Sequence, residues 1–244
     1  MENNNEETLK VTWLGQGGFL IEINRIRILI DPYLSDSLSA RGLKRLYPVP
    51  VKLEDLRPEV VFFTHDHADH FDEQTVRPLA ELYPHCKMAG PASVYEHYIR
   101  LSLKPDCFTV FNCGDIYGLG DISVKAVPAY HTDPYSIGMV ISFGERKIYL
   151  SGDTLLDDRL IPAVKQETGL DFDLMMICIN GKLGNMNAID ALYVTSQLHP
   201  RIVIPMHYGL FAENTTDPEP FVNAVSKAGL QCLTMVPGQP VEFK

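Results

Sequence analysis

The sequence lacks three features that would each define a class of protein. It has no apolar run long enough to cross a bilayer, and its polar, acidic first ten residues lack the basic-then-apolar order of a secretory signal. Its five cysteines are scattered and form no CxxC pair, so neither a disulfide framework nor a thiolate zinc site is indicated. We therefore expect a soluble, cytoplasmic protein that does not bind membranes.

Positive charge is also scarce. The chain has 21 Lys and Arg against 31 Asp and Glu, a formal net charge of −10. Such a protein does not present the positive field on which non-specific nucleic-acid binding depends. Arg41, Lys44 and Arg45 form a local basic cluster inside the irregular stretch 35–56, which we expect to be a surface excursion near one rim of a sheet. The expected partner is a small molecule.

The chain has enough apolar sequence to fold around a sizeable core. Hydrophobic residues make up 45% of its 244 residues, and we find no internal repeat, low-complexity segment or Gly/Ser/Pro-rich linker. We therefore expect residues 1–244 to form a single domain.

Nine segments rich in Val, Ile, Phe or Tyr predict β-strands, at residues 9–14, 19–23, 26–30, 60–64, 122–128, 137–143, 147–150, 174–179 and 202–205. Helices are predicted at residues 72–82, 92–101, 157–167, 187–199 and 218–228, several of which open on an Asp, Asn or Pro. Short turns join the early strands, whereas later strands alternate with helices. This order favours sheets packed together with helices outside them.

Residues 64–72, "THDHADHFD", concentrate three histidines and three aspartates in what we call the histidine loop. The loop follows the apolar segment "EVVFFT", which places it at the end of a strand. His131, Asp153 and His207 each follow a predicted strand in the same way. Because strand ends often carry the functional groups of a fold, this repeated arrangement indicates one shared site.

The side chains at these strand ends are typical metal ligands. Imidazole and carboxylate bind zinc or manganese, and a hydrolytic metal site keeps a position open for water. The candidates are His65, His67, Asp69, His70, His131, Asp153 and His207. Seven ligands are too many for one tetrahedral ion, but two ions about 3.5–4 Å apart would use them all. The alternative, a solvated histidine-rich turn, does not account for the three later residues.

The HxHxDH pattern at 65–70, with His131, Asp153 and His207 in order behind it, resembles the metallo-β-lactamase superfamily. The resemblance implies an α+β fold, a four-layered αββα sandwich. The stretches "WLGQGGFLIE", "IDPYLSDS" and "IPMHYGLF" are similar to the UlaG-like branch, which contains the L-ascorbate-6-phosphate lactonase. That branch implies a homo-oligomeric hydrolase that opens a lactone or ester of a small, sugar-like substrate, phosphorylated or not.

The resemblance also implies a role for each ligand. His65, His67 and His131 would hold the first metal ion, and Asp69, His70 and His207 the second. Asp153 would bridge two Mn²⁺ or Zn²⁺ ions that activate a shared hydroxide, and both Asp69 and Asp153 would act in catalysis. Asp31 matches the buried aspartate that hydrogen-bonds metal-bound histidines in this superfamily.

Substrate contacts are predicted less directly. The stretch "INGKLGNMN" at 179–187 is either a strand-to-helix loop capped by Asn187 or a substrate-binding loop. In the second interpretation Asn180, Lys182 or Asn185 contacts the substrate, with Arg159 and Tyr208 as further candidates. We interpret Gln16, Gly17 and Gly18 mainly as a tight turn between two strands. In the alternative, functional interpretation this turn borders the metal site.

Two other functions fit parts of the sequence. A phosphodiesterase or ribonuclease would use the same metal centre, and the basic cluster favours it, but the net charge of −10 argues against it. A non-catalytic metal-binding or sensing protein would keep the fold and lose ligands, whereas here the whole ligand set is present.

Overall fold

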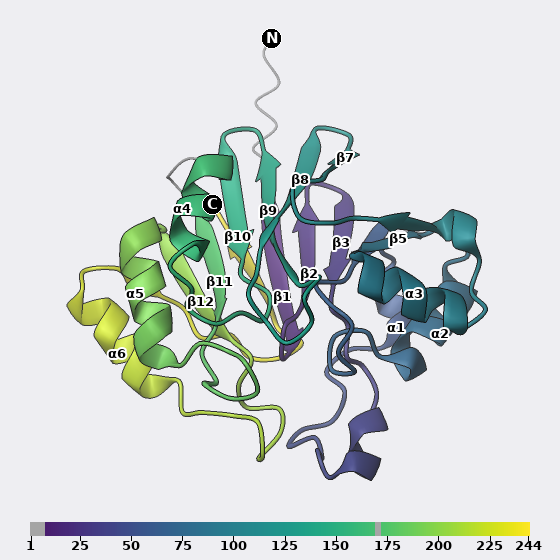
Figure 1. Cartoon of the computed structure of the whole chain (residues 1–244), viewed down its shortest axis with the longest axis horizontal. Helices are drawn as coiled ribbons and strands as arrows, with labels where there is room; N and C mark the ends of the chain where they lie inside the picture. The colour runs from purple at the N-terminus through teal and green to yellow at the C-terminus, as the bar shows by residue number, and fades with distance from the viewer. Residues whose placement is uncertain (1–7, 169–171) are drawn as a thin grey trace.

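Two seven-stranded sheets lie face to face in the computed structural model, which describes residues 8–168 and 172–244. The strand orders are β14-β1-β2-β3-β4-β5-β6 and β13-β12-β11-β10-β9-β8-β7. Helices α1–α3 cover the outer side of the first sheet and α4–α6 that of the second (Figure 1). This is the αββα layer order that the resemblance implies, so the predicted α+β sandwich is confirmed.

The elements have the following bounds. The first sheet contains β1 (Leu9–Gly15), β2 (Gly18–Ile23), β3 (Ile26–Ile30), β4 (Val60–Phe62), β5 (Lys87–Gly90), β6 (Phe108–Val110) and β14 (Pro240–Phe243). The second contains β7 (Ile116–Leu119), β8 (Ile122–Pro128), β9 (Ile137–Phe143), β10 (Arg146–Leu150), β11 (Leu174–Cys178), β12 (Ile202–Met206) and β13 (Gln231–Cys232). The helices are η1 (Ser37–Arg41), α1 (Leu53–Leu56), α2 (Glu73–Leu82), α3 (Ala92–Arg100), η2 (Pro105–Cys107), α4 (Leu160–Thr168), α5 (Ala188–Leu198) and α6 (Glu219–Lys227).

All nine predicted strands and all five predicted helices are present. The sequence analysis missed β5, β6, β7, β13 and β14, together with the short helices η1, α1 and η2. Each missed strand has at most four residues, too few to show a clear hydrophobic period. The stretch 35–56 contains η1 and α1, so it is more regular than the sequence indicates.

Burial follows strand position in the sheet. All five residues of β11, "LMMIC", are buried, because this strand pairs in parallel with both β10 and β12 and is covered on both faces. The edge strand β7 instead alternates exposed and half-buried residues. The apolar faces of both sheets meet in one large core cluster.

The strand directions bring several strand ends together. β3 and β4 run in parallel in the first sheet, as do β10, β11 and β12 in the second. Their carboxyl ends lie at one end of the sandwich and carry Asp31, the histidine loop, Asp153 and His207.

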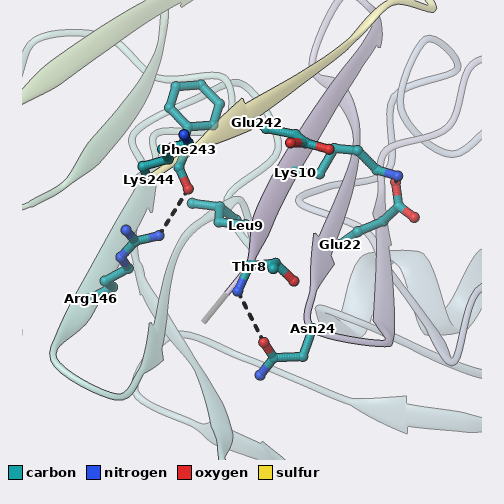
Figure 2. Close-up of a pocket in the computed structure, with 9 residues that line it drawn as sticks. All are labelled: Thr8, Leu9, Lys10, Glu22, Asn24, Arg146, Glu242, Phe243 and Lys244. Atoms are coloured by element: carbon teal, nitrogen blue, oxygen red, sulfur yellow. Dashed lines mark hydrogen bonds and ion pairs between the residues drawn. The ribbon is translucent and has the colours of Figure 1, made fainter. Parts of the chain in front are cut away.

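The opposite end of the sandwich has a cavity of about 620 Å³, which we call the terminal cavity (Figure 2). It is lined by the start of β1, the turn after β2, Arg146 and the end of β14. There Lys10 pairs with Glu22 at 2.9 Å, and Arg146 Nη1 donates to the carbonyl oxygen of Phe243 at 3.2 Å. Within the described part of the chain, no helix is long and apolar enough to span a bilayer.

Candidate metal centre

The histidine loop is a tight turn fixed by its own backbone. The carbonyl oxygen of His67 accepts from the amides of His70 at 2.9 Å and Phe71 at 2.7 Å. Asp72 then caps α2 by accepting from the Gln74 amide. The turn therefore holds several ligand-type side chains between a buried strand and a capped helix.

Three histidine nitrogens converge at the first part of the cluster. His65 Nε2 lies 2.9 Å from His67 Nδ1, and His131 Nε2 lies 3.1 Å from the same atom. His65 and His67 come from the loop after β4, whereas His131 follows β8. The two sheets thus supply ligand atoms to one point.

Asp69, His70 and His207 form the second part. His70 Nε2 lies 3.4 Å from His207 Nε2 and 3.8 Å from Asp69 Oδ2, and His207 Nε2 lies 3.5 Å from that oxygen. His207 follows β12 with a left-handed backbone (φ 64°), which is unusual for a residue with a side chain. This geometry turns its ring toward the first sheet.

Asp153 lies between the two parts. Its Oδ2 is 3.0 Å from His207 Nε2, 3.4 Å from His70 Nε2 and 3.9 Å from His131 Nε2. Its Oδ1 is buried and has no hydrogen-bond partner among the described residues. An unpaired oxygen on a buried carboxylate is costly. Nitrogen and oxygen donors arranged in this way fit a divalent metal ion.

The electrostatics of the cluster also favour a cation. Burial lowers the pKa of His65 well below its ordinary value, so its ring is neutral, the form that binds metal. Burial acts against protonation of His207 as well, but the charge of Asp153 outweighs it and raises the pKa of His207 to about 9. Burial acts to raise the pKa of Asp69, but the charge of His70 and a hydrogen bond from His207 outweigh burial and bring this pKa below its ordinary value. The carboxylates therefore stay ionised and attract positive charge.

A hydrogen-bonded shell fixes the orientation of the rings. Asp31 Oδ2 lies 2.8 Å from His70 Nδ1 and accepts from Thr64 Oγ1 at 2.6 Å. Because the Thr64 hydroxyl donates to Asp31, it can accept from His65 Nδ1, 2.9 Å away. Both rings then present Nε2 to the centre of the cluster, and the role of Asp31 in orienting metal-bound histidines stays a prediction. His131 is held similarly, with its Nδ1 2.9 Å from the Gly184 carbonyl oxygen.

The turn between β1 and β2 contacts the cluster directly. Gln16 Nε2 donates to Asp69 Oδ2 at 3.0 Å, and the Gln16 side chain is fully buried. A Cβ on Gly17 would lie 2.8 Å from His70 Cε1, so a side chain there would displace the ring. The sequence analysis assigned this turn mainly a structural role, and the structure adds a contact with a candidate ligand.

A cavity of about 570 Å³ opens onto the cluster, and we call it the metal-site cavity. Besides the candidate ligands, its walls include Leu38, Arg41, Leu43, Leu183 and Asn214. The first three come from the stretch 35–56, which therefore forms one wall.

The five predicted substrate contacts do not line this cavity as the structure describes it. Asn185 Nδ2 donates to Asp153 Oδ2 at 2.8 Å, and Lys182 Nζ donates to the Glu213 carbonyl at 3.0 Å.

The other three have different surroundings. Arg159 pairs with Asp157, Tyr208 packs against Trp13, and Asn180 donates to Asn214. Their substrate roles stay predictions.

The sequence analysis placed Gln16 near the metal site only in its second interpretation, and it missed Asn214 as a site residue. The position of Asn214 in the loop that follows His207 was the available signal.

Comparison with known proteins agrees with this geometry. The family model described as "Beta-lactamase superfamily domain" matches residues 26–208. A UPF0173 metal-dependent hydrolase of Pyrobaculum neutrophilum is 33% identical over 96% of this chain and 100% of its own length. One from Oenococcus oeni is 32% identical over 88% and 92%, respectively.

Among solved structures, Igni18, a metallo hydrolase from Ignicoccus hospitalis, superposes with a TM-score of 0.78 over 97% of this chain and 99% of its own. At 24% identity it shows the shared fold. Together with the histidine and aspartate cluster between the sheets, these matches establish that the chain belongs to the UPF0173 metal-dependent hydrolases of the beta-lactamase superfamily.

Proposed function

We propose that the protein is a hydrolase with a dinuclear metal centre that opens a lactone or ester of a small molecule. The observation that carries the proposal is the position of Asp153 Oδ2, within 3.0–3.9 Å of nitrogens from both parts of the cluster. A carboxylate shared in this way is what two neighbouring ions require.

The ligand assignment follows the two parts of the cluster. One ion would be held by His65, His67 and His131, and a second by Asp69, His70 and His207, as the three groups of converging ligand atoms support. Asp153 would be shared. Two Zn²⁺ or Mn²⁺ ions bound there would supply Lewis acidity and lower the pKa of a shared water to near neutral.

The chain's own residues keep this arrangement rigid. Asn185 holds Asp153 Oδ2 at 2.8 Å and Gln16 holds Asp69 Oδ2 at 3.0 Å, so neither carboxylate is free to rotate away. Asp69 lies at the cavity wall, where its carboxylate is able to orient an attacking water. Fixed groups of this kind need no reorganisation during the reaction.

The size of the metal-site cavity supports a small substrate. Its volume of about 570 Å³ lies within the usual range for small-molecule sites. The choice of a sugar-like lactone, phosphorylated or not, rests on the resemblance of three sequence stretches to the UlaG-like branch. The same resemblance supports a homo-oligomeric enzyme, and the polar, acidic first ten residues support a cytoplasmic one.

The test combines metal content with activity. Protein purified without chelator is analysed for bound metals, stripped, refilled with Mn²⁺ or Zn²⁺, and assayed against a lactone panel and a phosphodiester. We expect about two metals per chain and lactone opening that depends on refilling. Cleavage of the phosphodiester alone would favour a phosphodiesterase, and only trace metal in every preparation would refute the dinuclear centre.

A further inference from the structure

Two loops at the metal-site end are joined by hydrogen bonds beside the metal-site cavity. Residues 179–187 follow β11, and residues 207–216 follow β12. Lys182 Nζ donates to the Glu213 carbonyl at 3.0 Å, and Asn180 Nδ2 donates to Asn214 Oδ1 at 2.7 Å. The loop after β12 is therefore held at two neighbouring points, the Glu213 carbonyl and the Asn214 side chain.

Hydrogen bonding fixes which end of the Asn214 amide faces Asn180. Asn180 Nδ2 also lies 3.3 Å from the Lys182 carbonyl oxygen, which can only accept. Asn180 must therefore present its NH₂ group on that side. Since this NH₂ also faces Asn214, Asn214 must present its oxygen, and its own NH₂ group is left over.

The remaining NH₂ group belongs to a buried cavity wall. Asn214 is only 3% exposed, and it lines the metal-site cavity together with Asp69, Asp153 and His207. Within residues 8–168 and 172–244 the structure gives its side-chain nitrogen no hydrogen-bond acceptor. This nitrogen is not one of the fully buried atoms that lack a partner, so it is accessible at the cavity wall. A donor that a second buried amide holds in a fixed orientation at a cavity wall is available to an acceptor on a ligand.

The same cavity has a cationic wall residue. Arg41 lines it, and no ion pair or hydrogen bond engages its guanidinium within the described residues. Leu38, Leu43 and Leu183 supply apolar surface nearby. A donor and a cation facing one space favour acceptor oxygens that carry negative charge.

We propose that Asn214 is a substrate-binding residue whose amide donates to an oxygen of a carboxylate or phosphate group on the substrate, with Asn180 as its positioning residue. The inference rests on the proposed function, because it names the substrate class of that site. The substrate is then a small anion whose apolar part contacts the leucine wall.

The test measures binding rather than turnover. Calorimetry on metal-loaded protein uses inorganic phosphate and succinate as probes, so that a phosphate preference is distinguished from a carboxylate preference. Asn214→Asp is the central variant, because its carboxylate still accepts from Asn180 but no longer donates into the cavity. Asn214→Ala removes both contacts, and Asn223→Asp on the exposed side of α6 is the matched charge control.

We expect Asn214→Ala to weaken binding of the preferred probe about tenfold and Asn214→Asp to weaken it further, with metal content and melting temperature unchanged. Asn180→Ala should weaken it less, because Asn214 then rotates freely. Asn223→Asp should bind like the wild type. Equal affinities in the wild type and both Asn214 variants, or no binding of either probe by the wild type, would overturn the proposal. If the wild-type protein binds a probe and both Asn214 variants weaken that binding, but the wild type opens no lactone, the result would count against the proposed function alone.

Discussion

The two ends of the sandwich both have cavities lined by polar groups, yet they differ in how those groups are satisfied. At the terminal cavity Lys10 and Glu22 form a local ion pair whose side chains remain 34% and 13% exposed (Figure 2). At the metal-site end His65, His70 and Asp31 are fully buried, and Asp153 keeps an unpaired oxygen.

The terminal cavity is the larger of the two, about 620 Å³ against about 570 Å³. Size therefore does not identify the functional end. Burying ionisable groups costs free energy, and a fold retains such a cluster where a bound ion repays the cost.

Asp153→Asn should have the largest effect on activity, because it removes the shared charge at the metal-site end while keeping the shape of the side chain. We expect kcat/KM to fall by at least about 10³-fold, since a metal centre supplies several kcal/mol of transition-state stabilisation. Metal content and steady-state kinetics on the lactone found active in the panel measure this. Glu22→Gln at the terminal cavity is the matched control and should retain wild-type values. Full activity in Asp153→Asn would refute the shared-carboxylate assignment.

Asp31→Asn tests the hydrogen bonds that orient the rings of the candidate ligands. Asp31 Oδ2 lies 2.6 Å from Thr64 Oγ1 and 2.8 Å from His70 Nδ1. The substitution removes the negative charge and replaces one carboxylate oxygen by an NH₂ group, so the side chain no longer accepts from Thr64 and His70 as the carboxylate does. We expect metal affinity or activity to fall by about 10- to 100-fold, the usual effect of losing such a partner. Competition with a metal-binding dye measures the affinity. An unchanged value would mean that the ring of His70 is held by packing alone.

Metal binding should release protons. In the metal-free protein burial acts against protonation, but nearby carboxylates, Asp153 foremost, raise the pKa of His70 well above its ordinary value and that of His207 to about 9. Both rings therefore carry a proton at pH 7 that a metal must displace, so metal affinity rises as the pH rises through about 9, the pKa of His207, and falls as the pH drops. Calorimetry in two buffers of different ionisation enthalpy counts the protons. A buffer-independent enthalpy at pH 7 would contradict the prediction.

The smallest effect is expected at the terminal cavity. Lys10→Gln removes the partly exposed pair with Glu22, which contributes at most about 1 kcal/mol to the free energy of unfolding. Chemical denaturation measures this difference, and activity should not change. A loss of activity in Lys10→Gln would show that the two ends are coupled.

The sequence predicted what local patterns encode. Strands such as β9 and β11 carry long apolar runs, and the metal-ligand candidates directly follow recognisable strands. Short edge elements were missed because their pairing is tertiary, as for the two residues of β13 and for β14 beside β1.

The same limit applies to the site. Gln16 meets Asp69 across 53 residues of sequence, and Asn214 meets Asn180 across 34. No local pattern encodes such separations. The nine residues of the histidine loop, by contrast, contain four of the seven candidate ligands.

The division of the ligands between the sheets has a consequence for how the molecule folds. The histidine loop belongs to the first sheet, whereas His131, Asp153 and His207 belong to the second. Neither sheet alone carries all seven candidate ligands, so an ion that needs both groups would bind fully only after the two sheets have packed together. A metal ion bound by this cluster would add its binding free energy to the free energy of docking. Removing the metal with a chelator should therefore weaken the packing between the two sheets before either sheet unfolds.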